Sequence, residues 1–93
     1  MTPKIKVKTN FLFGGSNPEG MPLPSDISTI GDLLQHIGEE IDFRLIDVDS
    51  RHVRENIEVT INGKDIWFYP AGLDTPLTDG DLVDVSLIPL GGG

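Results

Sequence analysis

The chain of 93 residues contains no cysteine. Disulfide bonds, cysteine-based zinc sites and thiol nucleophiles are therefore excluded, and the core must be stabilised by packing alone. Basic residues are also scarce, because 7 lysines and arginines stand against 15 aspartates and glutamates, for a formal net charge of −8. A surface of this sign repels phosphate backbones, so we expect no nucleic-acid partner. Acidic character usually serves solubility, and it also suits a protein partner with a basic docking face.

Long apolar runs are missing too. None approaches the roughly 18 residues of a membrane span, and the first residues lack the apolar segment of a signal peptide. We therefore expect a cytoplasmic protein with no membrane partner. The length predicts one domain, since domains run to about 50–250 residues. We place this domain at residues 1–90, followed by a flexible glycine tail at 91–93.

Two strands are expected in the first part of the chain. Residues 4–13 alternate apolar and polar side chains, which is the period-two pattern of a half-buried strand. One side of this strand carries the apolar residues and Thr9, and the other is polar: Ile5, Val7, Phe11 and Phe13 against Lys4, Lys6, Lys8 and Asn10. A cluster of turn-forming residues follows at 14–20. Residues 21–27 form the expected returning strand, which Pro22 and Pro24 confine to a sheet edge.

The clearest helix begins after Thr29. Asp32 lies three residues later and completes a variant of the capping box. Apolar residues then recur at helical spacing and form a single stripe: Ile30, Leu33, Leu34, Ile37 and Ile41. Gly38 weakens the last turn by up to about 1 kcal/mol. We expect the helix to end near Glu40 or Ile41.

The segment 42–56 mixes apolar and charged residues, and we expect a connection there with a short strand or turn. Residues 57–61 alternate as a strand does and end in Asn62-Gly63, a strong hairpin pattern. Residues 64–69 are the expected partner strand, with at least one of its aromatic side chains exposed or packed under the next connection. An exposed apolar face beside the tail would suit the docking of a partner, although core packing is the more common role for any single aromatic residue.

The remaining elements complete an α+β fold. A turn-rich connection is expected at 71–81 and a last strand at 82–90, where apolar and polar residues alternate. One main helix that covers one face of a mixed sheet of four to five strands is the economical way to bury these apolar faces.

No catalytic or metal-binding pattern emerges. His36 and His52 lack a third ligand at sensible spacing. Asp47-Val48-Asp49-Ser50 begins like a calcium loop but lacks the later ligands. No nucleophile is paired with a base. We therefore expect neither an enzyme, nor a bound metal, nor a bound cofactor.

Three consecutive glycines, Gly91, Gly92 and Gly93, end the sequence. At an average glycine frequency of about 7%, this has a chance of roughly 0.03% at one chosen place. Glycines lack Cβ atoms, so such a tail fits a narrow channel. An α-carboxyl group, with a pKa of about 3.3–3.7, is ionised at neutral pH and would attack the α-phosphate of ATP to give an acyl-adenylate. The alternative is a fraying tail or a leftover linker.

Four stretches resemble the ThiS/MoaD-type β-grasp sulfur carriers, which are ubiquitin-like proteins. They are residues 29–34, 57–63, 73–83 with their Asp-Gly-Asp, and 89–93. Within this family, the sequence of these stretches is most similar to that of the small subunit of molybdopterin synthase. Phe13-Gly14-Gly15 and Trp67 are similar to features of the ubiquitin-related modifier of tRNA thiolation.

The resemblance implies a ubiquitin-like β-grasp fold and a two-step activation. An ATP-dependent, ubiquitin-activating-like enzyme would adenylate Gly93, and a sulfur donor protein would convert it to a thiocarboxylate. The sulfur would then serve molybdopterin or a related cofactor pathway, with a large synthase subunit as a further partner. Gly92 and Gly91 would give the tail its reach, and Leu90 and Ile88 would anchor its base against the partner.

Two alternatives remain open at this stage. One is a ubiquitin-like modifier that is joined through Gly93 to lysines of target proteins. The other is a non-covalent interaction domain whose tail plays no part. Both the carrier and the modifier pass through the same adenylate, so the sequence does not separate them.

Overall fold

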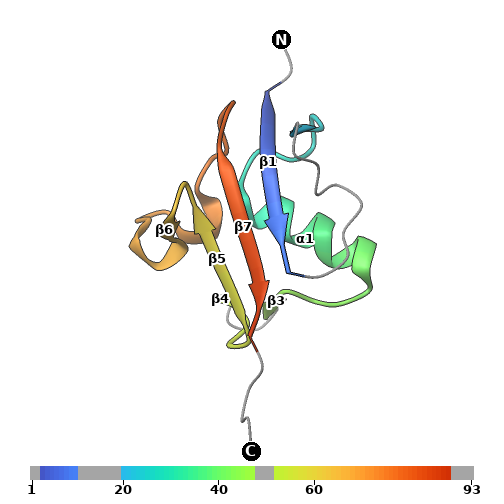
Figure 1. The fold of residues 1–93 in the computed structure, drawn as a ribbon, viewed down its shortest axis with the longest axis vertical. Coiled ribbons are helices and arrows are strands. Elements are labelled where there is room, and N and C mark those ends of the chain that lie inside the picture. Colours follow the sequence, from blue (N-terminus) through green and yellow to red (C-terminus); the bar gives the residue numbers. More distant parts are fainter. Residues whose placement is uncertain (1–2, 11–19, 48–51, 89–93) are drawn as a thin grey trace, which may run out of the picture.

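One helix lies across one face of a five-stranded mixed sheet (Figure 1). The computed structural model describes residues 3–10, 20–47 and 52–88. Its elements are β1 (Lys4–Thr9), β2 (Met21–Pro22), α1 (Ile30–Ile41), β3 (Ile46–Asp47), β4 (His52–Val53), β5 (Ile57–Ile61), β6 (Lys64–Asp65), the 3-10 helices η1 (Ile66–Phe68) and η2 (Gly72–Asp74), and β7 (Leu82–Leu87). This confirms the α+β class, with its mixed sheet on one main helix.

The strand order in the main sheet is β2-β1-β7-β5-β6. The last strand, β7, therefore lies in the middle, between β1, which is parallel to it, and β5, which is antiparallel. Val83 of β7 lies opposite Val7 of β1, and Val85 lies opposite Val59 of β5. β2 pairs with the outer side of β1, which confirms the edge position expected for the strand that contains Pro22.

Alternating side chains explain why these segments are strands. In β1, Ile5 and Val7 are buried, whereas Lys4, Lys6 and Lys8 are exposed, as predicted. The two phenylalanines expected to continue this pattern, at 11 and 13, lie outside the described residues. The same alternation in β5 and β7 buries a second row of apolar residues: Ile57, Val59, Ile61, Val83 and Val85.

The capping box fixes where α1 begins. The Thr29 Oγ1 atom accepts a hydrogen bond from the Asp32 backbone N–H at 3.2 Å, and Asp32 Oδ2 accepts one from the Thr29 N–H at 3.2 Å. The helix ends at Ile41, within the predicted range, and Asp42 follows with a left-handed backbone at φ 54°. Its apolar stripe packs on the sheet and includes the buried residues Ile30, Leu33, Leu34 and Ile37.

The Asp32 carboxylate should make the stability of the protein depend on pH. Hydrogen bonds from the backbone N–H of Ser28, and then of Thr29, hold the pKa of Asp32 below its ordinary value of 3.8. A lowered pKa means that its stabilisation is complete above about pH 4 and is lost as the pH falls through the lowered pKa. We expect Asp32→Asn to cost roughly 1 kcal/mol at neutral pH. In urea unfolding, the difference from wild type should shrink as the pH is lowered to about 3, and a difference independent of pH would contradict this role.

Two glycines of α1 allow close contacts with other segments. A Cβ atom at Gly31 would lie 2.8 Å from the Leu73 carbonyl oxygen of η2, and one at Gly38 would lie 2.8 Å from the Phe43 carbonyl oxygen. Distances this short would force the backbone to shift. Gly38 thus does more than weaken the last turn, because its lack of a side chain lets the chain fold back under the helix.

The structure differs from expectation in four places. The returning strand expected at 21–27 is wrong beyond Pro22, because β2 covers only Met21–Pro22. The 42–56 connection contains a small hairpin, β3 with β4, whose 48–51 turn lies outside the described residues. The strand expected at 64–69 is wrong beyond Asp65, because the Asp65 carboxylate accepts a hydrogen bond from the Trp67 N–H at 2.9 Å and starts a 3-10 helix instead. The last strand ends at Leu87, and of the residues expected to extend it only Ile88 is described.

Candidate functional site

The structure describes the root of the tail but not the tail itself. Leu90, Gly91, Gly92 and Gly93, which the sequence singled out, lie outside the described residues. Ile88 is the last described residue and follows directly on β7. The candidate site is therefore built from Ile88 and its surroundings.

Hydrogen bonds from two directions fix this root. The Ile88 N–H donates to the Asn56 carbonyl oxygen at 2.7 Å, just before β5. On the other side, the Asn10 side chain brackets Leu87, because its Nδ2 donates to the Leu87 carbonyl oxygen at 2.9 Å and its Oδ1 accepts from the Leu87 N–H at 2.8 Å. The chain is thus held on both sides up to the point where the tail begins. The Ile88 side chain remains 39% exposed.

The Asp-Gly-Asp stretch fixes the opposite end of β7. Asp81 accepts hydrogen bonds from the Thr78 N–H at 2.8 Å and from the Asn62 side chain at 3.0 Å, and Asn62 in turn accepts one from the Leu82 N–H at 3.0 Å. Gly80 has φ +89°, a conformation that suits glycine. These residues lock the start of β7 to the Asn62 turn, so their role in the described structure is architectural.

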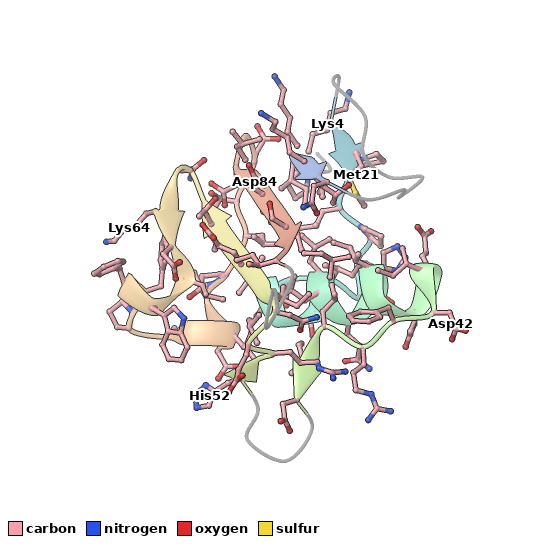
Figure 2. The ribbon with its side chains drawn as sticks, turned by 60° about the horizontal axis from the view of Figure 1, so that its bottom comes forward. Lys4, Met21, Asp42, His52, Lys64 and Asp84 are labelled. Carbon is pink, nitrogen blue, oxygen red and sulfur yellow. The ribbon has the colours of Figure 1, made fainter. Side chains whose placement is uncertain are left out.

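An open groove of about 700 Å³ begins at the root. Ile88 lines it together with the outer edge of β5, and η1 and the β3–β4 hairpin supply other lining residues. On that outer edge β6 pairs only with Thr60 and Ile61, so no strand of the described sheet covers Ile57–Val59. Figure 2 shows His52 of β4 and Lys64 of β6 on the same side of the molecule, away from Asp42 at the end of α1.

Two aromatic side chains of η1 project into solvent. Trp67 is 73% exposed and Phe68 is 70% exposed, which confirms that at least one aromatic residue of this segment is not in the core. The Trp67 ring stacks on the His52 ring, with centroids 5.7 Å apart. Tyr69 behaves differently, because its hydroxyl donates to the Ile61 carbonyl oxygen at 2.8 Å and its ring is half-buried.

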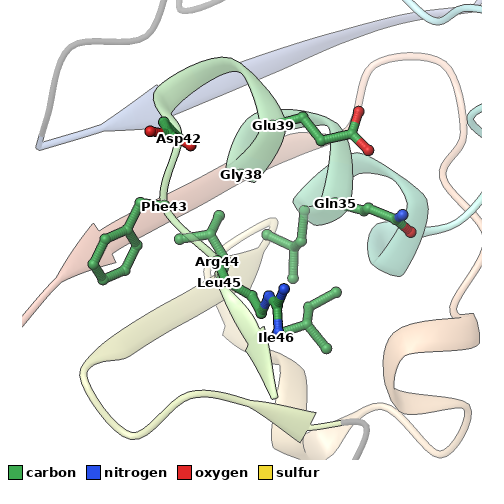
Figure 3. Close-up of a pocket in the computed structure, with 9 residues that line it drawn as sticks. Gln35, Gly38, Glu39, Asp42, Phe43, Arg44, Leu45 and Ile46 are labelled. Atoms are coloured by element: carbon green, nitrogen blue, oxygen red, sulfur yellow. The ribbon is translucent and has the colours of Figure 1, made fainter. Parts of the chain in front are cut away.

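A second groove, of about 530 Å³, lies at the C-terminal end of α1 (Figure 3). Gly38, Phe43 and Arg44 are among its lining residues, and Ile88 is not. The Arg54 guanidinium lies 5.6 Å from the centre of the Phe43 ring and donates to the Arg44 carbonyl oxygen at 3.5 Å. This groove shares no lining residue with the first one and does not reach the tail root.

Among the described residues, the histidines do not form a metal site with their neighbours. His36 lies 3.8 Å from Glu40 on the surface of α1, whereas His52 stacks on Trp67. Within residues 3–10, 20–47 and 52–88, no group of three histidine, cysteine, aspartate or glutamate side chains is placed to hold a metal ion. In the same ranges, no helix has the length and apolar character needed to cross a membrane.

The sequence matches no protein-family model and no curated protein sequence. Solved structures do resemble it. The HVO 2177 protein of Haloferax volcanii has a TM-score of 0.69 and 25% identity, over 98% of this chain and 88% of that one. Small archaeal modifier protein 1 (SAMP1) of Methanosarcina acetivorans has a TM-score of 0.62 and 24% identity, over 100% and 99% of the chains. Urm1 of Trypanosoma brucei has a TM-score of 0.61 and 20% identity, over 98% and 97%.

The chain has the ubiquitin-like β-grasp fold. This confirms the β-grasp fold that the resemblance in the sequence implied. In this β-grasp domain, the residues that matter for the tail come from three separate strand ends: Asn10 after β1, Asn56 before β5, and Ile88 after β7. The sequence singled out Ile88 as a contact for a partner, which stays a prediction, and gave no sign of the two asparagines.

Proposed function

We propose that this β-grasp protein is a sulfur carrier that works through the carboxylate of Gly93. One observation supports the proposal most. Hydrogen bonds hold β7 up to Ile88 on both sides, beside an open groove, and the slender sequence Pro-Leu-Gly-Gly-Gly follows at once. A rigid domain that ends in a narrow, side-chain-poor segment suits delivery of a reactive carboxylate to another protein's active site.

The chemistry takes two displacements. A carboxylate oxygen of Gly93 attacks the α-phosphorus of ATP, a new P–O bond forms, and pyrophosphate leaves. Hydrosulfide then attacks the carbonyl carbon of the acyl-adenylate, AMP leaves, and loss of one proton gives the thiocarboxylate. In the cell, a sulfur donor protein would supply the sulfur. Leaving-group activation by the phosphate makes the second step favourable without any catalytic group in this chain.

The described residues contribute architecture and contact surface to this reaction. A ubiquitin-activating-like enzyme would supply the catalytic residues and bind the ATP. We infer that the sulfur then goes to molybdopterin or a related cofactor, in which case a large synthase subunit is a further partner. Ile88 and Leu90 would rest against these partners and fix where the tail enters their channels.

The test is an intact-mass measurement. The full chain is incubated with the ubiquitin-activating-like enzyme of the same organism, ATP and sulfide. We expect the mass to rise by the difference between sulfur and oxygen, with fragmentation placing the change at Gly93. An unchanged mass with every competent activating enzyme, or a change located elsewhere, would overturn the proposal.

A second candidate is a protein modifier conjugated through Gly93 to lysines of other proteins. The fold shared with small archaeal modifier protein 1 favours this alternative specifically. High-mass conjugates that survive a denaturing gel, and that contain a Gly93–lysine isopeptide bond, would support it. A carrier that is not a modifier would leave only the free chain on the same gel.

A further inference from the structure

Within the described residues, the strands present no large exposed apolar side chain on the face of the sheet opposite α1. The residues of this face alternate with those of the core and are mainly charged or polar: Lys6, Lys8, Glu58, Thr60, Asp84 and Ser86. Of these, Glu58 belongs to the segment of β5 that also lines the 700 Å³ groove. Lys8 of β1 lies opposite Asp84 of β7 in the register. This face therefore lacks the apolar centre that a stable protein contact usually contains.

Exposed apolar surface lies at the β5 side of the sheet instead. Among the described residues, the large exposed apolar side chains are Phe43, Trp67, Phe68 and Ile88. Trp67 and Ile88 line the 700 Å³ groove, and Phe68 follows Trp67 on η1. We call Trp67, Phe68 and Ile88 the aromatic edge. Because Ile88 is also the root of the tail, a partner bound here would meet the tail where it leaves the domain.

The aromatic edge is held in place before any partner arrives. The Asp65 carboxylate accepts the Trp67 N–H at 2.9 Å, which fixes the backbone of η1, and the His52 ring stacks on the indole. A side chain that is already ordered loses little conformational entropy on binding. Tryptophan is also the residue type most enriched among the few side chains that dominate interface energies.

The walls of the groove are acidic. Glu55 and Glu58 line it and are exposed, and Asp47 and Asp65 are also among its lining residues. Arg54 is the one lysine or arginine among the lining residues in the described part of the chain, and its guanidinium lies over the Phe43 ring. An apolar anchor flanked by carboxylates is complementary to an apolar pocket flanked by lysine or arginine.

We propose that the aromatic edge and its acidic groove, rather than the open face of the sheet, dock the activating enzyme. The occupant is a segment of that enzyme in which basic side chains surround an apolar pocket for Trp67. The identity of the partner rests on the proposed function, whereas the location and chemistry of the surface rest on the residues described above.

Steady-state kinetics of ATP–pyrophosphate exchange test the proposal. The full-length chain is titrated against the ubiquitin-activating-like enzyme of the same organism. Trp67→Ala should raise KM by at least about 30-fold, the size of an interface hot spot, with little change in kcat. Glu55 lies outside the strands and lines the groove, so Glu55→Lys should raise KM as well, and added salt should weaken wild-type binding because the attraction is electrostatic.

Two control variants separate this surface from others. Gln35→Ala, exposed on α1, should leave KM unchanged, and Lys8→Ala should change it by less than about threefold. Thermal unfolding of each variant shows whether it is folded, which we expect for Trp67→Ala because that side chain is mostly in solvent. A larger effect of Lys8→Ala than of Trp67→Ala would place the docking surface on the open face and overturn the proposal.

A binding measurement keeps the proposal separate from the proposed function. Trp67 is the only tryptophan, so biosynthetic incorporation of fluorotryptophan gives one fluorine NMR signal from this site. The signal should shift when the enzyme is added, even if no adenylate forms. Binding that shifts the signal without exchange or thiocarboxylate would leave the docking surface standing and the carrier function wrong.

Other outcomes overturn the docking surface. Exchange with equal KM for wild type and Trp67→Ala would show that the enzyme docks elsewhere, while the carrier function stands. A fluorine signal that shifts with protein concentration in the absence of enzyme would show that a second copy of the chain covers the edge. If the enzyme shows neither binding nor exchange with this chain, both proposals are wrong.

Discussion

Deleting Gly92 and Gly93 is expected to lower adenylate formation by more than about 100-fold while leaving the melting temperature unchanged. Two residues of extended chain span up to about 7 Å, so the deletion withdraws the carboxylate by that distance from the activating enzyme's ATP. A misplacement of only 1 Å can cost about 100-fold in rate. The fold should not respond, because the described contacts of the domain end at Ile88. Pyrophosphate exchange and thermal unfolding measure the two effects.

A length-matched variant sharpens this experiment. Replacing Gly92 and Gly93 by alanine keeps the carboxylate at the same reach and adds two Cβ atoms, so its loss of activity reports the width of the channel rather than the length of the tail. We expect an intermediate rate. If the deleted chain still supports the in-cell function, the protein is a tail-independent interaction domain and the carrier proposal is wrong.

Leu33→Ala is expected to lower the free energy of unfolding by about 2–5 kcal/mol. Leu33 is fully buried where α1 packs on the sheet, and its removal leaves a cavity that the neighbouring side chains fill only in part. Without cysteine there is no disulfide to compensate. For a domain of this size, each kcal/mol corresponds to roughly 4–8 °C in Tm, so the loss would be visible in thermal unfolding as well as in urea.

Gln35→Ala on the exposed side of the same helix is the matched control. It changes the same turn of α1 without making a cavity, and we expect its effect to stay within about 0.5 kcal/mol. A loss below about 1 kcal/mol for Leu33→Ala would mean that α1 does not pack on the sheet as described. Comparable losses in both variants would point to helix propensity, rather than core packing, as the source of stability.

Local chemistry explains which elements the sequence predicted well. The boundaries of α1 follow from the Thr29–Asp32 capping box and from an apolar stripe, and both involve residues within a few positions of each other. The strand expected at 64–69 failed for a local reason as well. Its aromatic and branched composition favoured a strand. The Asp65 side chain instead accepts a hydrogen bond from the Trp67 N–H and caps a 3-10 helix at this point.

The candidate site was harder to predict because its contacts are distant in the sequence. Asn10 brackets Leu87 across 77 positions, and this contact exists only because β1 and β7 are parallel neighbours in one register. No local pattern around Asn10 or Asn56 signals such a role. Gly38 is a similar case. Its lack of a side chain allows the Phe43 carbonyl oxygen to approach closely, and this contact cannot be read from the sequence of the helix itself.

The central position of β7 has a mechanical consequence for anything that pulls on the tail. Tension applied beyond Ile88 runs along the axis of a strand that pairs with β1 on one edge and with β5 on the other. Such a load shears the hydrogen bonds of both ladders together, whereas a strand peeled from a sheet edge would lose them one at a time. The domain should therefore stay folded when a partner enzyme pulls the tail into a channel and releases it again.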